Sequence, residues 1–216
     1  MQYNQDTYSL HIETSTTLCS VALGKNADCI GSIDADDGEY HSEKLHLFVN
    51  ELMKRNHLKF QDLSFIAVSN GPGSYTGLRI AAAAAKTFSY ALNIPLITIS
   101  TLHTQAYALL DKGVNNFQYI ISTMQARGSK IYIAIYDAQL KEIVSPQAFI
   151  LAEENIQKLN ANYPKSIWIG SGIKNIAEYA HFADIKPFSK YMIKESYQRY
   201  ISKQFADLVY FEPMYI

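Results

Sequence analysis

The stretch "SNGPGSYTGLRIAAAAAKTF", residues 69–88, joins a loop rich in glycine to a segment rich in alanine. A short apolar run at residues 65–69 precedes it, and Pro95 stands just beyond Asn93. Glycine permits backbone conformations that other residues avoid, and proline is common past a helix end because it cannot continue the helix. The pattern predicts a strand, a tight loop at residues 70–77 and a helix that ends near Asn93.

A glycine-rich loop before a helix is also the usual place for a phosphate-binding loop. The Walker pattern requires GxxxxGK before Ser or Thr, but Thr76 stands in the place of the second glycine and no lysine follows it. The GxGxxG pattern fails by one residue, and Pro72 removes a backbone N–H donor. We therefore interpret Gly71, Pro72, Gly73 and Gly77 as a structural loop that lets the helix begin sharply.

The predicted helix is apolar over most of its circumference, which is typical of a helix covered on more than one side. One stripe contains Leu78, Ala81, Ala82, Ala85, Phe88, Ser89 and Leu92. A second stripe contains Ile80, Ala84, Thr87 and Ala91. The first stripe can pack on the chain's own sheet, and the small residues of the second let another helix approach closely. From the residues alone, that cover is either the neighbouring helix of this chain or another protein.

The rest of the chain alternates between strand and helix patterns, which predicts an α/β fold. The expected strands lie at residues 9–12, 16–23, 29–33, 65–69, 95–100, 119–122, 130–136, 142–145 and 166–170. Besides the alanine-rich helix, the expected helices lie at residues 42–53, 102–111 and 152–159, with a helical pattern from 194 to 209. The first of these places Leu45, Phe48, Val49 and Leu52 on one face.

The polar stretch at residues 111–116 is the best candidate for a boundary between two lobes. The segments "SLHIETSTTLCSVALGKNADCIGSI" (9–33) and "QYIISTMQARGSKIYIAIYDAQLKEIV" (118–144) both predict strand, polar loop, strand, turn and strand. Such internal similarity indicates a repeated unit. We expect an N-terminal α/β lobe at residues 1–111 and a smaller C-terminal α/β lobe at residues 112–216.

Composition restricts the possible partners and the location. The formal net charge is −1, so the chain lacks the basic excess that direct RNA binding usually requires. No apolar run approaches the roughly 20 residues that cross a bilayer. The polar N-terminus lacks the apolar stretch of a signal peptide. We expect a cytoplasmic protein that does not bind membranes.

The residues with catalytic potential do not form a recognisable site. His41 and His46 flank Glu43, but five residues turn a helix by about 140°, so the two imidazoles would not converge on a metal. Glu13 follows the first strand, where carboxylates often bind metal in α/β proteins, but its counterpart in the second lobe is the uncharged Gln125. We expect no catalytic residue, no metal and no cofactor.

Four segments carry a resemblance to a known family: "LHIETSTTLCSVAL" (10–23), "HSEKLHLFVNELM" (41–53), "IAVSNGPGSYTGLRIAAAAAKTFSYALNIPLITISTL" (66–102) and "EPMYI" (212–216). They resemble the TsaB (YeaZ) family of the Kae1/TsaD/YeaZ superfamily, strongly in the first half and loosely in the second. The resemblance implies the actin-like, sugar-kinase-like (ASKHA) ATPase fold, with two similar α/β lobes. Older descriptions give this family a glycoprotease-like label.

The resemblance also implies a function. Members of the family are regarded as non-catalytic cytoplasmic subunits that pair with TsaD, and with the ATPase TsaE. The complex forms N6-threonylcarbamoyladenosine in tRNAs that read codons beginning with A, so tRNA is reached only through the complex. The alternative is an active enzyme of the same fold, either an ATP-dependent phosphotransferase or a glycoprotease-like metallopeptidase.

The resemblance assigns partner binding to the two helices of the first lobe, which form a bundle with TsaD or with a second copy of the chain. The residues expected there are Leu45, Phe48, Val49, Leu52, Gly77, Ile80, Ala81, Ala84, Thr87 and Ala91. TsaD holds its metal with an HxxxH pattern that residues 41–46 lack. Two further departures are IETS at residues 12–15 in place of IDTS, and Gln125–Ala126–Arg127 in place of Asp–Ala–Arg.

Overall fold

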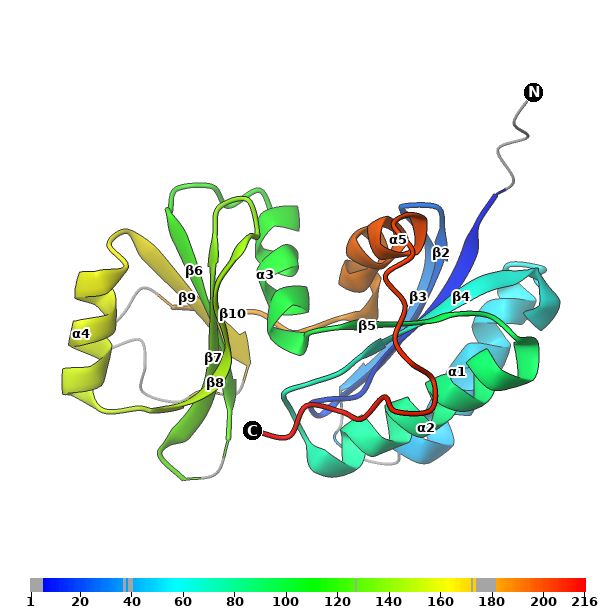
Figure 1. Ribbon diagram of the computed structural model, residues 1–216, viewed down its shortest axis with the longest axis horizontal. Coiled ribbons are helices and arrows are strands. Elements are labelled where there is room, and N and C mark those ends of the chain that lie inside the picture. The colour runs from blue at the N-terminus through cyan, green and yellow to red at the C-terminus, as the bar shows by residue number, and fades with distance from the viewer. Residues whose placement is uncertain (1–5, 37, 39–40, 127, 172, 174–181) are drawn as a thin grey trace. The chain divides into compact units, whose positions relative to one another are not determined.

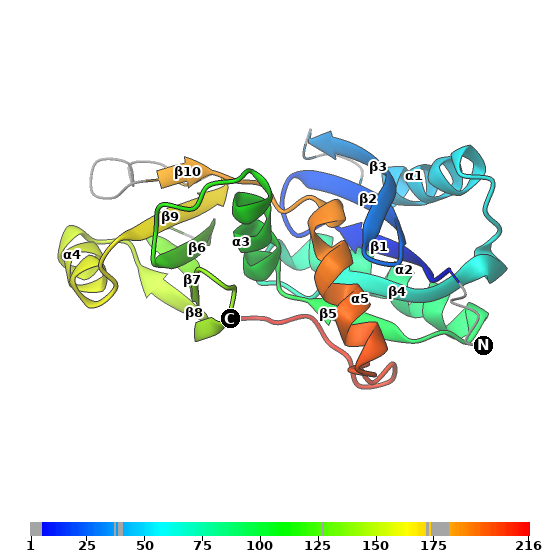
Figure 2. The same cartoon turned by 90° about the horizontal axis from the view of Figure 1, so that it is seen from above.

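The computed structural model describes residues 6–36, 38, 41–126, 128–171, 173 and 182–216. These residues form two compact units, each built around a five-stranded mixed sheet. One unit contains residues 1–100 and 188–214, and the other contains residues 101–187 and 215–216. Figures 1 and 2 show the elements of each unit from two directions.

The first sheet has the order β3-β2-β1-β4-β5. Its strands are β1 (Tyr8–Glu13), β2 (Leu18–Lys25), β3 (Asp28–Asp36), β4 (Leu63–Ser69) and β5 (Leu96–Ile99). The first three strands form an antiparallel meander, whereas β4 runs parallel to β1 with Ile12 opposite Val68. Because parallel strands end at the same edge of a sheet, the end of β1 at Glu13 lies beside the end of β4 at Ser69.

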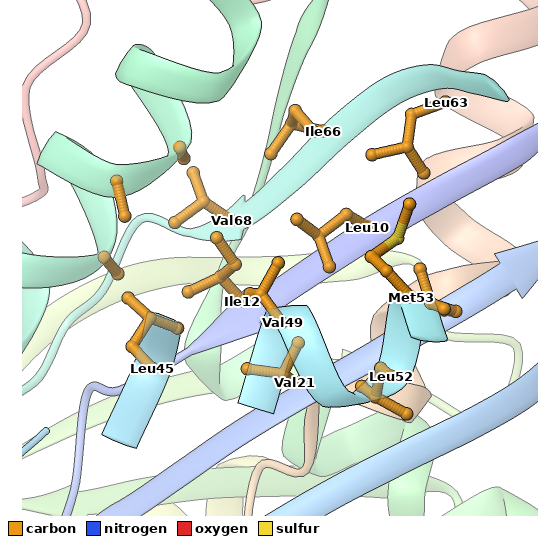
Figure 3. Close-up of a cluster of buried hydrophobic side chains, with 14 of the residues drawn as sticks. Leu10, Ile12, Val21, Leu45, Val49, Leu52, Met53, Leu63, Ile66 and Val68 are labelled. Carbon is orange, nitrogen blue, oxygen red and sulfur yellow. The ribbon is translucent and has the colours of Figure 1, made fainter. Parts of the chain in front are cut away.

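Helices cover both faces of this sheet. On β4, Ile66 and Val68 join the core beneath α1 (His41–Arg55) and α2 (Tyr75–Leu92), as Figure 3 shows for the α1 side. The alternate residues Phe65 and Ala67 join a second cluster that includes Tyr197 and Tyr200 of α5 (Ile193–Ile201). This period-two division is what a sheet covered on both faces requires.

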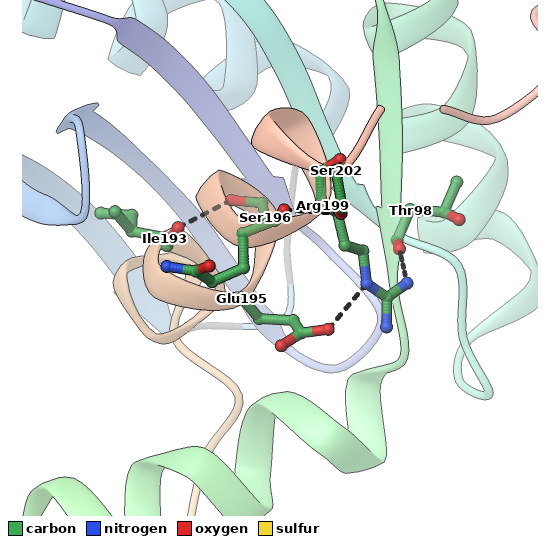
Figure 4. A network of polar contacts seen from close by, with 7 residues as sticks. Thr98, Ile193, Glu195, Ser196, Arg199 and Ser202 are labelled. Atoms are coloured by element: carbon green, nitrogen blue, oxygen red, sulfur yellow. Dashed lines mark hydrogen bonds and ion pairs between the residues drawn. The ribbon is translucent and has the colours of Figure 1, made fainter. Parts of the chain in front are cut away.

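Helix α5 is fixed to the first sheet by polar contacts as well as by apolar packing (Figure 4). Arg199 donates from Nη1 to the carbonyl oxygen of Thr98 at 2.7 Å and from Nε to Glu195 at 2.8 Å. On β1, His11 Nε2 lies 2.8 Å from Ser196 Oγ. Burial lowers the pKa of His11 to about 3, so the imidazole is neutral at neutral pH.

The second sheet repeats the order of the first, as β10-β9-β6-β7-β8. Its strands are β6 (Tyr119–Gln125), β7 (Lys130–Asp137), β8 (Glu142–Ile150), β9 (Ser166–Ser171) and β10 (Phe182–Asp184). Again the first three form a meander and the fourth pairs in parallel with the first. The helices α3 (Thr101–Asp111) and α4 (Glu153–Asn162) belong to this unit. The predicted repeat of two α/β lobes is therefore confirmed.

The division between the units differs from the boundary expected after residue 111. Helix α3 belongs to the second unit, where Gln105 accepts a hydrogen bond from Ser122 at 3.0 Å. Residues 188–214 return to the first unit and carry α5. The physical reason is that the chain crosses over after the fifth strand of each sheet, and local composition does not reveal a crossing.

The expected helix from 194 to 209 is wrong beyond Ile201. Lys203 has a φ of 57°, which ends the helical conformation, and Ala206 N then donates to Leu96 O at 2.8 Å. The apolar residues that continue the helical spacing belong instead to an extended segment beside β5 and a turn. An unpaired edge of a sheet offers hydrogen-bonding groups that compete with helix propagation, which a periodicity in the sequence does not include.

Candidate functional site

The glycine-rich loop is packed directly against the end of β1. A Cβ atom on Gly77 would lie 1.9 Å from the carbonyl oxygen of Thr14, and one on Gly73 would lie 2.5 Å from that of Ser15. Ser74 N donates to Ser15 O at 2.7 Å, and Thr14 Oγ1 donates to Gly77 O at 2.7 Å. The two glycines are required because only they permit this approach of two backbones.

The start of α2 is consequently occupied by the chain itself. Ser74 caps the helix by accepting a hydrogen bond from Gly77 N at 3.3 Å. Gly71 has a φ of 98° and Pro72 is buried. In a phosphate-binding loop the backbone N–H groups at this place point at the ligand, whereas here Ser74 N donates to Ser15 O and the backbone of Thr14 lies against Gly77.

Glu13 is a fully buried carboxyl group at the edge where β1 and β4 end. Its Oε1 accepts a hydrogen bond from Ser15 N at 2.5 Å, and Oε2 has no partner among the described residues. Desolvation raises the pKa of Glu13 to about 7, and hydrogen bonds from Ser15 and the Ser69 side chain oppose the rise. A single carboxyl group supplies at most one of the groups that phosphoryl transfer requires, which are positioned metal ions and a base.

The corresponding place in the second unit is used to close a hairpin. Gln125 Nε2 donates to the carbonyl oxygens of Ala126, Gly128 and Lys130 at 3.1, 3.2 and 3.2 Å. An amide can serve all three acceptors in turn, and a carboxylate could serve none of them. The departure at Gln125 thus has a structural role, and Arg127 lies outside the described residues.

The two histidines that flank Glu43 have separate surroundings. His41 Nε2 lies 3.2 Å from the carbonyl oxygen of Thr17, and the His46 ring packs on Phe88 with 6.1 Å between ring centroids. Within the described part of the chain, no three His, Cys, Asp or Glu side chains come together as metal ligands. None of the helices described there is long and apolar enough to cross a membrane.

The structure divides the ten expected partner-binding residues into a buried and an outward-facing group. Those buried inside their own unit are Leu45, Val49, Leu52, Gly77, Ala81 and Ala84. Phe48 and Ile80 are half-buried, and Thr87 and Ala91 are exposed. The buried side chains pack on the first sheet, so they cannot form a surface for another protein.

Ala84 needs the clearest correction, because the second stripe was expected to lie together on one face. It is only 6% exposed and belongs to the core cluster, while its neighbour Ala83 is exposed. The cause is α1, which packs beside α2 and covers the Ala84 side of the helix. Of the alternatives left open by the sequence, the neighbouring helix therefore accounts for part of the stripe.

The remaining outward surface of the two helices is here named the α1–α2 outer face. It contains Leu47, Phe48, Ile80, Ala83, Thr87, Tyr90 and Ala91. Leu47 is 65% exposed and Tyr90 is 81% exposed. The sequence analysis missed Leu47, Ala83 and Tyr90, which lie on the side of each helix away from its buried residues; the same helical periodicity, counted from the buried residues, places them on the outside.

The two sheets share one strand order, and comparison with solved structures shows that this is the actin-like, sugar-kinase-like ATPase fold. An inorganic polyphosphate/ATP-glucomannokinase from Arthrobacter shares the fold with a TM-score of 0.53 and 12% identity, covering 93% of this chain and 100% of that one. A Pseudomonas aeruginosa protein described as similar to peptidase YEAZ has a TM-score of 0.82 and 21% identity, covering 98% of this chain and 99% of that one.

Residues 35–199 match the family model described as "TsaD: tRNA N6-adenosine threonylcarbamoyltransferase", and the chain belongs to this family. The tRNA threonylcarbamoyladenosine biosynthesis protein TsaB of Buchnera aphidicola is 28% identical over 181 residues, 82% of this chain and 80% of the relative. The TsaB of Bacillus subtilis is 32% identical over 148 residues, 67% of this chain and 62% of the relative. The resemblance to TsaB (YeaZ) proteins is thus confirmed.

Proposed function

We propose that this chain is a non-catalytic subunit that pairs with TsaD, the threonylcarbamoyltransferase, in forming N6-threonylcarbamoyladenosine in tRNA. The observation that carries the proposal is the contrast between the two ends of the alanine-rich segment. Its glycine loop is filled by Thr14 and Ser15, whereas the outer side of α2 is lined by small exposed residues. TsaB relatives named for this biosynthesis support the assignment.

The proposal that the chain lacks its own catalytic site is supported by the residues beside the strand ends. Glu13 is a carboxyl group at the end of β1, but at the corresponding place in the second unit the amide of Gln125 donates to carbonyl oxygens of a hairpin. An ATP-dependent phosphotransferase of the same fold would bind nucleotide as the isolated chain. Calorimetry with magnesium–ATP tests this alternative, and saturable micromolar binding to the isolated chain would contradict the non-catalytic assignment.

The α1–α2 outer face is the surface that we assign to TsaD. Alanine and threonine side chains on α2 leave room for a second helix to approach closely, and Leu47 and Phe48 supply apolar area beside them. Because the chain matches the model of the TsaD family itself, its partner carries a related pair of helices. Two related faces can pack on one another about an approximate two-fold axis, as in a symmetric dimer. The proposal also includes pairing of two copies of this chain through the same face, and recruitment of TsaE to the complex.

The test is a substitution on this face that leaves the core intact. Ala83→Arg places a long charged side chain on an exposed position of α2, so the isolated chain should stay folded. Binding to TsaD from the same organism, measured by analytical ultracentrifugation, should be lost because the arginine prevents close packing. Ala83→Ser is the matched control and should bind as the unmodified chain does. Retained binding by Ala83→Arg would refute this assignment of the surface.

A further inference from the structure

Residues 207–211 form a turn that presents two apolar side chains to solvent. Val209 is 76% exposed and Tyr210 is 82% exposed, whereas Leu208 and Phe211 on either side of them pack against the core of the first unit. Large exposed apolar side chains standing together are a common sign of an interaction surface. Leu208 and Phe211 therefore hold the turn against the first unit, while Val209 and Tyr210 face solvent.

Several hydrogen bonds fix the conformation of this exposed turn. Asp207 Oδ1 accepts hydrogen bonds from Val209 N at 2.8 Å and Tyr210 N at 3.0 Å, and Phe211 N donates to Asp207 O at 2.8 Å. Lys86 of α2 donates from Nζ to the carbonyl oxygens of Val209 and Phe211, each at 3.2 Å. A surface held in one conformation before binding loses less entropy when a partner docks on it.

The turn lies next to the α1–α2 outer face. Lys86, which bonds the turn, stands one helical turn before Tyr90, and residues four apart share a side of a helix. Figure 1 shows the C-terminal segment running from α5 past β5 to α2. Tyr90, Val209 and Tyr210 therefore continue the outer face across α2 and onto the turn; these three residues are named the C-terminal patch.

The area of the helices alone argues for such an extension. A stable protein interface buries on the order of 800 Å² on each partner. The exposed residues that α2 contributes to the outer face before Tyr90 are Ala83 and Thr87, which offer little area. Aromatic side chains bury roughly 150–250 Å² each, so the two tyrosines of the patch add about 300 Å².

We propose that the C-terminal patch is a third part of the TsaD-binding surface and anchors the partner beside the helices. The inference rests on the proposed function, since it takes TsaD as the occupant of the outer face. The patch carries no charge and ends in two phenol groups. The chemistry that fits it is an apolar depression on TsaD with hydrogen-bond acceptors at its rim.

The experiment compares the unmodified full chain with two variants by titration calorimetry with TsaD. Tyr90→Ala/Tyr210→Ala should raise the Kd about tenfold or more, because buried tyrosines are frequent hot spots. Both side chains are largely exposed, so the thermal unfolding of the isolated variant should match that of the unmodified chain. Ile150→Ala, at a 54% exposed position in β8 of the second unit, is the control and should leave the Kd unchanged.

The outcomes separate the patch from the function. If Ala83→Arg abolishes binding while the double tyrosine variant binds TsaD normally, the patch assignment is wrong and the proposed function stands. If the unmodified chain does not bind TsaD, both are wrong. If the double variant changes only the self-association of the chain in the ultracentrifuge, a second copy occupies the patch and the assignment to TsaD is overturned.

Discussion

At the scale of single residues, Glu13 is a buried acid whose pKa near 7 changes the pH dependence of stability. The folded chain holds the proton more tightly than the unfolded chain, where the pKa has its ordinary value of 4.5. Stability is therefore lost as the pH rises from about 4.5 through 7, and the loss is complete above that.

Glu13→Gln should remove this loss, since an amide is neutral at every pH. We expect the variant to gain on the order of 3 kcal/mol relative to the unmodified chain between pH 5 and pH 8.5. Urea unfolding at the two pH values measures the gain. The exposed Glu212 supplies the control Glu212→Gln, which should show no such difference. An equal effect of Glu13→Gln at both pH values would contradict the raised pKa.

Gly77 is a second residue whose identity is imposed by a single contact. In Gly77→Ala the new methyl group would meet the backbone oxygen of Thr14, which cannot move away without shifting β1. We expect a loss of about 2–3 kcal/mol in the free energy of unfolding, despite the better helix propensity of alanine. In the control Gly31→Ala the methyl group meets only the side-chain ends of Asn56 and Leu52, at 3.2 and 3.3 Å. A loss for Gly77→Ala no larger than for the control would show that the loop can relax.

At the scale of elements, α2 shows what the sequence could and could not predict. Its existence, its end at Asn93 and the role of glycine before it follow from local patterns. The division of its faces does not, because the position of α1 decides that Ala84 is inside and Ala83 outside. The prediction of a longer C-terminal helix was wrong for a similar reason. Ala206 pairs with Leu96 at the edge of β5, so the helix ends before it.

The contrast between two adjacent alanines gives a prediction for the helix. Ala84→Arg would force a charge into the core cluster, so the isolated chain should lose at least about 3 kcal/mol of stability or fail to fold. Ala83→Arg should change the melting temperature by no more than a few degrees. Circular dichroism during heating distinguishes the two variants. Similar melting temperatures would contradict the burial of Ala84 and the exposure of Ala83.

The bond between α5 and β5 gives a second prediction at this scale. Arg199→Met removes the hydrogen bond to the Thr98 carbonyl and the contact with Glu195 while it keeps most of the aliphatic volume. We expect a loss of about 1–2 kcal/mol, because the half-buried carbonyl loses a charged donor. Glu195→Gln is the control, since it preserves the bond to Thr98 and should cost less. The free energy of unfolding in urea provides the comparison.

At the scale of the whole molecule, the chain contains one α/β unit twice, and after the fifth strand of each sheet it crosses to the other. Helix α3 follows β5 but packs on β6 and β9, and α5 follows β10 but packs on β4 and β5. The repeat could be recognised from the alternation of strands and turns in each half. The return of α5 to the first sheet could not, since it depends on contacts between residues about a hundred positions apart, such as Arg199 and Thr98.

This crossing predicts that residues 1–111 do not fold alone. Without residues 188–214, one face of the first sheet loses Met192, Tyr197 and Tyr200, which cover Phe65 and Ile97. The fragment should aggregate or give a poorly dispersed NMR spectrum, and a peptide of residues 188–216 should restore dispersion. A well-folded fragment without the peptide would show that α5 is dispensable.

The late position of α5 in the sequence has a consequence for synthesis on the ribosome. The strands of the first sheet emerge early, but the helix that covers one of their faces begins 94 residues after the end of β5. During that interval the uncovered aromatic and aliphatic side chains are available to chaperones, or to other nascent chains. Slow translation of the intervening segment would lengthen this exposure, so the yield of native protein should depend on codon usage between residues 101 and 187.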